Sequence, residues 1–133
     1  MVEGPRATPP CILVVDDDRA YLDFMATLLG FEAYAARLAA SLAEADEALR
    51  EEPPDLVICD LRLPGAPVAA VLDRLVADPA WAAPPVLLCS GAAQDLDDGL
   101  RRLGRARAQA LLKPFDIDEL LACVRRALHP PRA

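Results

Sequence analysis

The sequence has only one histidine, and it contains no apolar run long enough to cross a membrane. Its four cysteines lie far apart, without the C-x-x-C pairing or the spacing typical of metal and redox sites. Two of them, Cys59 and Cys89, end apolar runs, where a free cysteine behaves as a small buried hydrophobic residue. Such cysteines suit a reducing compartment, and the first residues lack the basic start of a secretory signal. We therefore expect a cytoplasmic location.

Basic residues are also scarce relative to acidic ones. The chain carries 14 lysines and arginines against 21 aspartates and glutamates, which gives a formal net charge of −7. An acidic domain repels the phosphates of nucleic acids and anionic lipid headgroups. We interpret the local basic cluster as a solvated helix end and loop; it consists of Arg101, Arg102, Arg105 and Arg107. We expect neither nucleic acid nor a membrane surface as a partner.

The length and composition predict a single globular domain. A chain of 133 residues, 54% hydrophobic and 26% charged, can bury a substantial core without disulfides or metals as staples. Prolines are frequent at both ends, where little else can be buried. We therefore expect a flexible tail at residues 1–10, a domain at 11–129 and a second tail at 130–133.

Short apolar runs alternate with helical patterns along this domain. Gly30 is placed to end the first helix, and Trp81 is expected to pack in a loop. The predicted strands are 12–15, 32–36, 56–59, 86–89 and 110–112, and the predicted helices are 19–29, 41–51, 67–76, 94–103 and 116–128. Strands that are apolar on both faces are typical of parallel sheets covered by helices. The alternation therefore predicts an α/β fold with a doubly wound, five-stranded parallel sheet.

Polar residues predict how three of the helices begin. Asp18 is placed to cap the first helix. Ser41 and Glu44 have the spacing of a capping box at the second, and Asp116 and Glu119 repeat that spacing at the last.

Helix capping does not explain the polar residues that end the predicted strands as a group. Asp16 and Asp17 follow the first strand, Asp60 the third, Ser90 the fourth and Lys113 the fifth. In an open parallel sheet, groups just beyond the carboxyl ends of the strands meet in one crevice. We therefore expect carboxylates, a hydroxyl and an ammonium group to share one site.

Three carboxylates in a partly dry crevice repel one another, and a divalent cation would remove this conflict. The all-oxygen ligand set of Asp16, Asp17 and Asp60 suits a hard ion such as Mg²⁺, which also leaves room for water and a phosphate group. Zinc is disfavoured because no cluster of histidine and cysteine accompanies these residues.

A carboxylate beside magnesium can act as a nucleophile toward phosphorus and form an acyl phosphate. Asp60 is the candidate for this role, with Lys113 and Ser90 holding the phosphoryl oxygens by charge and hydrogen bonding. Each of these residues by itself is ordinary in a surface loop, and the prediction depends on their joint occurrence.

Four segments of the sequence together resemble the signatures of a known family. The segments VVDDD, LVICDLRLPG, LLCSG and LLKPF, within residues 11–128, resemble the four signatures of the response-regulator receiver domain of two-component signalling. The resemblance implies a flavodoxin-like strand order 2-1-3-4-5. It also implies a phosphoacceptor signalling domain rather than an enzyme, with a histidine kinase or a histidine phosphotransfer protein as phosphoryl donor.

Carried over residue by residue, the resemblance implies specific roles. Asp60 matches the phosphoacceptor, while Ser90 and Lys113 match the groups that contact the phosphoryl oxygens. The implied ligands of Mg²⁺ are Asp17, Asp60, the backbone carbonyl of Arg62, and Asp16 through water. The resemblance also implies a cis bond before Pro114.

The chain departs from the family pattern beside the site. Ala110 stands where the family usually has Tyr or Phe, the residue that couples the hydroxyl to the output surface. This departure supports an alternative, an interaction module that works without phosphorylation. A haloacid-dehalogenase-like phosphatase would use similar groups, but it places its nucleophile first and its acidic pair last, the reverse of the order here.

Two expectations about partners follow from the first helix and from the last two. In the family the first helix docks the histidine-bearing partner, and the resemblance makes Arg19 and Leu22 candidates for that contact. Tyr21, which lies between them in the sequence, is alternatively a core residue. A homodimer through the last two helices is possible, although Gly99 weakens the first of them as a platform.

Overall fold

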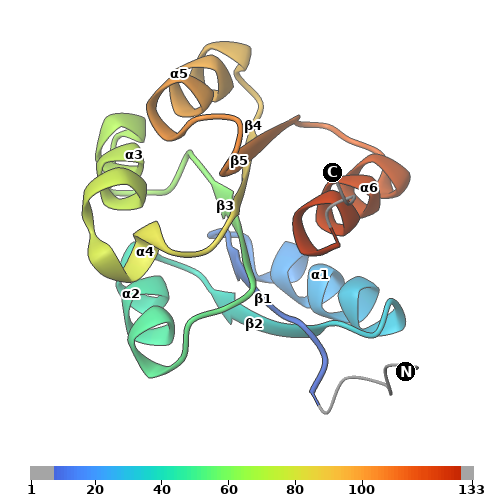
Figure 1. Cartoon of the computed structure of the whole chain (residues 1–133). Coiled ribbons are helices and arrows are strands. Elements are labelled where there is room, and N and C mark those ends of the chain that lie inside the picture. Colours follow the sequence, from blue (N-terminus) through green and yellow to red (C-terminus); the bar gives the residue numbers. More distant parts are fainter. Residues whose placement is uncertain (1–7, 130–133) are drawn as a thin grey trace.

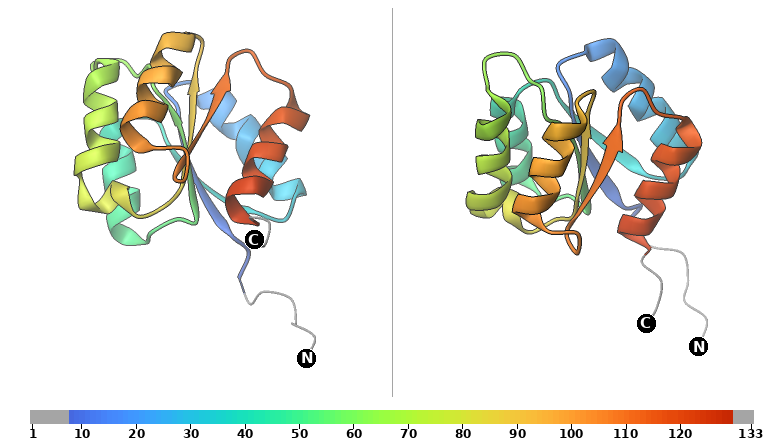
Figure 2. Two further views of the ribbon diagram at one scale, coloured as in Figure 1. Left: turned by 45° about the horizontal axis from the view of Figure 1, so that its top comes forward. Right: turned by 90° about the horizontal axis from the view of Figure 1, so that it is seen from above.

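The computed structural model describes residues 8–129, which form one twisted five-stranded sheet between two layers of helices (Figures 1 and 2). All neighbouring strands are parallel, in the order β2-β1-β3-β4-β5. The strands are β1 Cys11–Val15, β2 Ala35–Ala39, β3 Leu56–Asp60, β4 Val86–Ser90 and β5 Ala108–Leu112. The helices are α1 Arg19–Phe31, α2 Leu42–Glu51, α3 Val68–Ala77, α4 Pro79–Ala82, α5 Ala93–Leu103 and α6 Ile117–Leu128. The predicted flavodoxin-like order is confirmed.

The two faces of the sheet bury separate clusters of apolar side chains. Along β1, Leu13 and Val15 point to the side covered by α2, α3, α4 and α5. Ile12 and Val14 point to the side covered by α1 and α6. Each of these four side chains is at most 1% exposed. A strand buried on both faces has no polar position of its own, so polar residues enter only where it ends.

The prediction for β2 was shifted by three residues. α1 continues through Gly30 to Phe31, and Ala33 rather than a glycine takes the left-handed conformation, with φ of 64°. The turn is closed by hydrogen bonds from the Glu32 and Tyr34 N–H groups to the carbonyl of Leu29. Gly30 therefore does not cap the helix. Because β2 is an edge strand with mostly half-buried side chains, its apolar pattern is too weak to locate it.

The segment around Trp81 forms a short helix, α4, instead of the predicted loop. Trp81 is fully buried, and its indole Nε1–H donates to Asp46 Oδ1 of α2 at 2.7 Å. Asp46 also pairs with Arg74 of α3, so one carboxylate ties three helices together. Four residues are too few to show a helical period in the sequence.

Two of the three predicted caps are present. Asp18 Oδ1 accepts from the Tyr21 N–H at 3.1 Å. Ser41 Oγ accepts from the Glu44 N–H at 3.1 Å, while Glu44 Oε1 accepts from the Ala40 N–H at 3.0 Å. The capping box expected at Asp116 and Glu119 is wrong: within the described chain, the side chain of Asp116 makes no capping bond to α6.

Most of the two predicted tails, residues 1–7 and 130–133, lies outside the described residues. Pro10, assigned to the first tail, is buried, and its carbonyl accepts from the Ala35 N–H of β2 at 2.9 Å. Among residues 8–129, every helix is too short or too polar to span a bilayer.

Candidate functional site

The polar residues predicted to converge do meet at the carboxyl ends of the strands. Asp16 directly follows β1, and Asp60 and Ser90 are the last residues of β3 and β4. Lys113 follows β5, and its backbone N–H donates to the Ser90 carbonyl at 2.8 Å. β1 and β3 are neighbours whose following helices, α1 and α3, cover opposite faces of the sheet, which opens a crevice between them.

Three carboxylates form the acidic centre of this crevice. Asp16, Asp17 and Asp60 each offer an oxygen, and these oxygens lie within 4.8 Å of one another. Asp16 is 4% exposed and Asp60 is 8% exposed, whereas Asp17 is open to solvent. Burial raises the pKa of Asp60, and the nearby Asp16 acts in the same direction, against the lowering effects of the Arg62 N–H and Lys113. A cluster of oxygen ligands whose charge is disfavoured by burial fits a hard divalent cation such as Mg²⁺.

Lys113 bridges the two buried carboxylates of this centre. Its Nζ lies 3.0 Å from Asp16 Oδ2 and 3.2 Å from Asp60 Oδ2. Burial alone would lower the pKa of Lys113, but the contacts with Asp16 and Asp60 raise it above its usual value. The ammonium also lies 5.1 Å from the centre of the Tyr21 ring, a distance typical of a cation–π contact. The lysine therefore stays charged, and Tyr21 helps to position it. The Lys113–Pro114 bond is cis, as expected.

Ser90 makes its hydrogen bonds to a residue that the sequence did not identify. Its Oγ donates to Asp95 Oδ2 at 2.8 Å and accepts from the Ala92 N–H at 3.1 Å. Asp95, in the first turn of α5, is only 8% exposed. An acid at this point of a helix is usually explained by the helix dipole, and nothing in the sequence indicates that this one faces Ser90.

Arg62 connects Asp95 to the phosphoacceptor candidate. Its backbone N–H donates to Asp60 Oδ1 at 3.0 Å. Its guanidinium donates to Asp95 through Nε at 2.8 Å and through Nη2 at 3.3 Å. Hydrogen bonding to Arg62, against some desolvation, lowers the pKa of Asp95, so this carboxyl group is ionised near neutral pH. The role expected for the Arg62 carbonyl as a metal ligand stays a prediction.

The two docking residues expected on α1 differ in their exposure to solvent. Leu22 is 2% exposed and packs in the core under α1, so the prediction that it offers an apolar surface to a partner is wrong. The spacing of apolar residues located the helix but not its buried face. Phe24, on the same helix, is 48% exposed instead. Arg19 is exposed and pairs with Glu44 at 3.3 Å, and its part in docking stays a prediction.

Ala110 is half-buried on β5 and packs against the core on the α5 side of the sheet. The bulky side chain that the family usually has here is therefore missing at the face where α5 lies. Any connection from Ser90 to the surface of α5 in this chain has to use other residues.

Comparisons with known proteins point to one family. The family model described as "Response regulator receiver domain" matches residues 12–125. The chain is 33% identical over 120 residues to the DNA-binding dual master transcriptional regulator RpaA of Synechocystis, covering 90% of this chain and 49% of that protein. It is 35% identical over 118 residues to the transcriptional regulatory protein KdpE of Mycobacterium tuberculosis, covering 89% of this chain and 50% of that protein. It thus spans about half the length of these relatives.

A solved structure shows the same similarity at the level of the fold. The non-phosphorylated HemR receiver domain from Leptospira biflexa superposes with a TM-score of 0.76 at 28% identity, over 93% of this chain and 98% of that chain. The family-model match and these similarities show that this chain belongs to the response-regulator receiver family.

Proposed function

We propose that this receiver domain accepts a phosphoryl group on Asp60 from a phosphohistidine partner, either a histidine kinase or a histidine phosphotransfer protein. The observation that supports this best is the cluster of Asp16, Asp17 and Asp60, with oxygens within 4.8 Å, beside the Lys113 ammonium. Phosphorylation would then change which proteins the domain contacts. Free cysteines, two of them fully buried in the sheet, favour a cytoplasmic location.

Each side chain of the site has a separate role in an in-line transfer of the phosphoryl group. A carboxylate oxygen of Asp60 forms the new P–O bond, while the N–P bond to histidine breaks and the imidazole leaves with its electron pair. Lys113 holds a phosphoryl oxygen by charge, in place of its present contact with Asp60. The hydroxyl of Ser90 donates to another phosphoryl oxygen. These groups act by positioning and by neutralising charge.

The same carboxylates would hold the cofactor. Mg²⁺, when bound, would neutralise the carboxylates and the incoming phosphoryl oxygens. We assign Asp17 and Asp60 as direct ligands, the Arg62 carbonyl as a third, and Asp16 as a ligand through water. The donor set fits because all of these atoms are oxygens and one edge of the cluster, at Asp17, is open to water.

The proposal is tested by incubating the protein with MgCl₂ and acetyl phosphate or phosphoramidate and measuring the intact mass. We expect one phosphoryl adduct per chain, lost in Asp60→Asn and in the presence of EDTA. Asp97→Asn, which changes an exposed aspartate of α5, is the matched control and should be phosphorylated like the wild type. Absence of any adduct with these donors and with a phosphohistidine protein would instead favour a module that works without phosphorylation.

A homodimer through α5 and α6 stays a prediction. Light scattering of the phosphorylated and unphosphorylated protein distinguishes a dimer that depends on phosphorylation from a monomer in both states.

A further inference from the structure

The hydroxyl of Ser90 has only one proton, and in this structure that proton is already used. Both oxygens of Asp95 accept hydrogen bonds from the Arg62 guanidinium, so in the 2.8 Å contact between the two side chains Ser90 is the donor. The Ala92 N–H donates to the same hydroxyl oxygen at 3.1 Å. A phosphoryl group on Asp60 also offers only acceptors. Ser90 therefore cannot donate to a phosphoryl oxygen and to Asp95 at the same time.

Asp95 is held in place from a third element. Arg62, two residues after the end of β3, grips both oxygens of Asp95 through Nε and Nη2. A paired guanidinium and carboxylate of this kind has a defined orientation, because two parallel hydrogen bonds fix the plane of each group. Asp95 is 8% exposed, whereas the side chain of Arg62 that holds it is 64% exposed. Ser90, Asp95 and Arg62 thus form one hydrogen-bonded chain that begins beside Asp60.

The close packing of α5 against β4 brings Asp95 within hydrogen-bonding distance of Ser90. At Gly99 the helix lies so near the sheet that a Cβ atom would stand 2.5 Å from Leu88 Cδ1. Asp95 precedes Gly99 by one helical turn and lies on the same buried side of α5. The position of the first turn of α5 is therefore coupled to the hydrogen bond that Ser90 makes.

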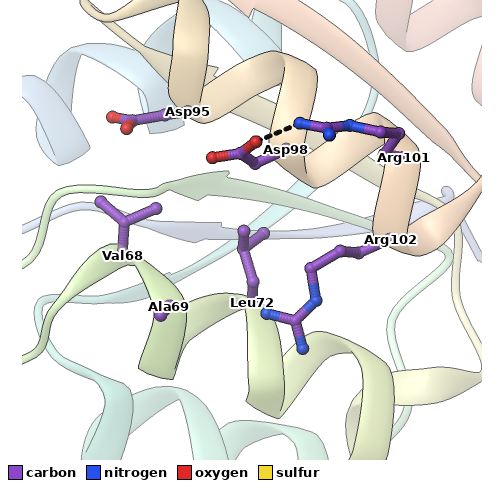
Figure 3. A pocket seen from close by; sticks show the side chains of 7 residues that line it. All are labelled: Val68, Ala69, Leu72, Asp95, Asp98, Arg101 and Arg102. Carbon is purple, nitrogen blue, oxygen red and sulfur yellow. Dashed lines mark hydrogen bonds and ion pairs between the residues drawn. The ribbon is translucent and has the colours of Figure 1, made fainter.

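Asp95 also reaches a surface groove between α3 and α5. Figure 3 shows Asp95 and Asp98 of α5 facing Val68 and Leu72 of α3 across this groove. The groove has a volume of about 450 Å³, and its far end is lined by Arg101 and Arg102. A movement of Asp95 would therefore alter the wall of this surface groove.

We propose that Asp95, held by Arg62, is a latch that occupies the proton of the Ser90 hydroxyl until Asp60 is phosphorylated. This inference rests on the proposed function. Phosphorylation draws the Ser90 proton to a phosphoryl oxygen, Asp95 keeps only Arg62, and the first turn of α5 is free to move at the groove. The latch connects the site to α5 without a bulky side chain at Ala110. Asp95 and Arg62 are positioning residues in this scheme, because they act through Ser90.

The test measures binding of beryllofluoride with Mg²⁺, which mimics a phosphoryl group on an aspartate, by isothermal titration calorimetry. Asp95→Ala frees the Ser90 proton, so we expect roughly tenfold tighter binding, the size expected for loss of a competing charge-assisted hydrogen bond. Asp98→Ala is the control, because Asp98 lies one turn further along α5 and bonds to Gln94 and Arg101 instead of Ser90. It should bind like the wild type.

A double-mutant cycle with Ser90→Ala separates the latch from a purely structural role. The gain from Asp95→Ala should vanish in the Ser90→Ala background, because there is no proton left to release. An equal gain in both backgrounds would overturn the latch, since it would show that freeing Arg62 or loosening α5 was enough. Should Asp95→Ala not fold, Asp95→Asn, which keeps the acceptor but loses the charge, is expected to bind with an affinity between those of wild type and alanine.

The outcomes for the latch and for the proposed function are distinguishable. Binding by the wild type with unchanged affinity in Asp95→Ala overturns the latch alone. Binding by Asp95→Ala but not by the wild type supports the latch in its strongest form. Failure of the wild type and of every variant to bind removes both proposals.

Discussion

Lys113 is the one lysine of the sequence, and its ammonium is shared by two buried carboxylates. Three carboxylates around one ammonium leave two negative charges uncompensated in the crevice. The charge of a magnesium ion matches this deficit. Asp17 contributes to the negative charge, but it is exposed and lies outside the contacts of Lys113 with Asp16 and Asp60. Under the proposed function, its carboxylate is the member of the cluster that is left to bind the metal ion.

We predict that Asp17→Asn changes stability in opposite directions with and without magnesium. Without the ion, removal of one of three like charges a few ångströms apart should raise the free energy of unfolding by up to about 1 kcal/mol. With Mg²⁺ at roughly ten times the dissociation constant of the wild type, the wild type should gain about 1.4 kcal/mol, and the variant much less. Urea unfolding with and without MgCl₂ measures both. Asp23→Asn, on the exposed side of α1, is the control; a variant that gained as much from Mg²⁺ as the wild type would show that Asp17 is not a ligand.

At the scale of elements, α5 depends on a residue that disfavours helices. Glycine in a helix interior is less favourable than alanine by about 1 kcal/mol, and Gly99 made this helix doubtful from the sequence alone. In the structure Gly99 is buried, and the space that a side chain would occupy is filled by Leu88 of β4, with Leu72 of α3 close by. The glycine therefore sets how closely α5 approaches the sheet.

We predict that Gly99→Ala destabilises the protein, although the same change at an exposed helical site would stabilise it. The added methyl group would stand 2.5 Å from Leu88 Cδ1, and relieving such overpacking typically costs about 1–3 kcal/mol. Thermal and urea unfolding give the change in free energy. In the background of Leu88→Val, which removes the contacting methyl, Gly99→Ala should be clearly less destabilising. A gain in stability for Gly99→Ala by itself would contradict the packing argument.

At the scale of the whole molecule, three of the four cysteines, Cys11, Cys59 and Cys89, lie at different depths in the fold. Cys59 is fully buried on the α5 side of the sheet, and Cys89 is 2% exposed on the α1 and α6 side. Burial raises the pKa of Cys89 to about 12, and it raises the pKa of Cys59 as well. Cys11, at the start of β1, is only half-buried. The thiolate is the reactive form, so burial and a raised pKa both protect Cys59 and Cys89, whereas Cys11, whose pKa burial also raises, stays partly accessible.

We predict that iodoacetamide modifies Cys11 in the native protein, whereas Cys59 and Cys89 react only when the whole domain unfolds. Peptide mapping after timed labelling in increasing urea gives the rate at each position. The rates at Cys59 and Cys89 should have the same urea dependence as unfolding followed by the fluorescence of Trp81, the single tryptophan and a fully buried one. Faster labelling of either residue than of Cys11 in the absence of urea would show that its strand opens locally.

Much of this protein was determined by local sequence patterns. Apolar runs located four of the five strands to within two residues, because strands buried on both faces have no polar interruptions. Once the strands were known, their polar ends identified Asp16, Asp17, Asp60, Ser90 and Lys113, since parallel strands bring their carboxyl ends together. Family membership followed from the same residues.

Other features were decided only by the tertiary structure, because they depend on how far apart the packed elements lie and on which way their side chains point. The sequence could not show that Leu22 faces the core and Phe24 the solvent, because apolar residues occupy adjacent faces of α1. It could not show that Asp95 meets Ser90 and Arg62, because that contact depends on how closely α5 packs on β4 at Gly99. A strand end is a local property of the chain, whereas a hydrogen bond between side chains of three elements exists only after packing has fixed their separation.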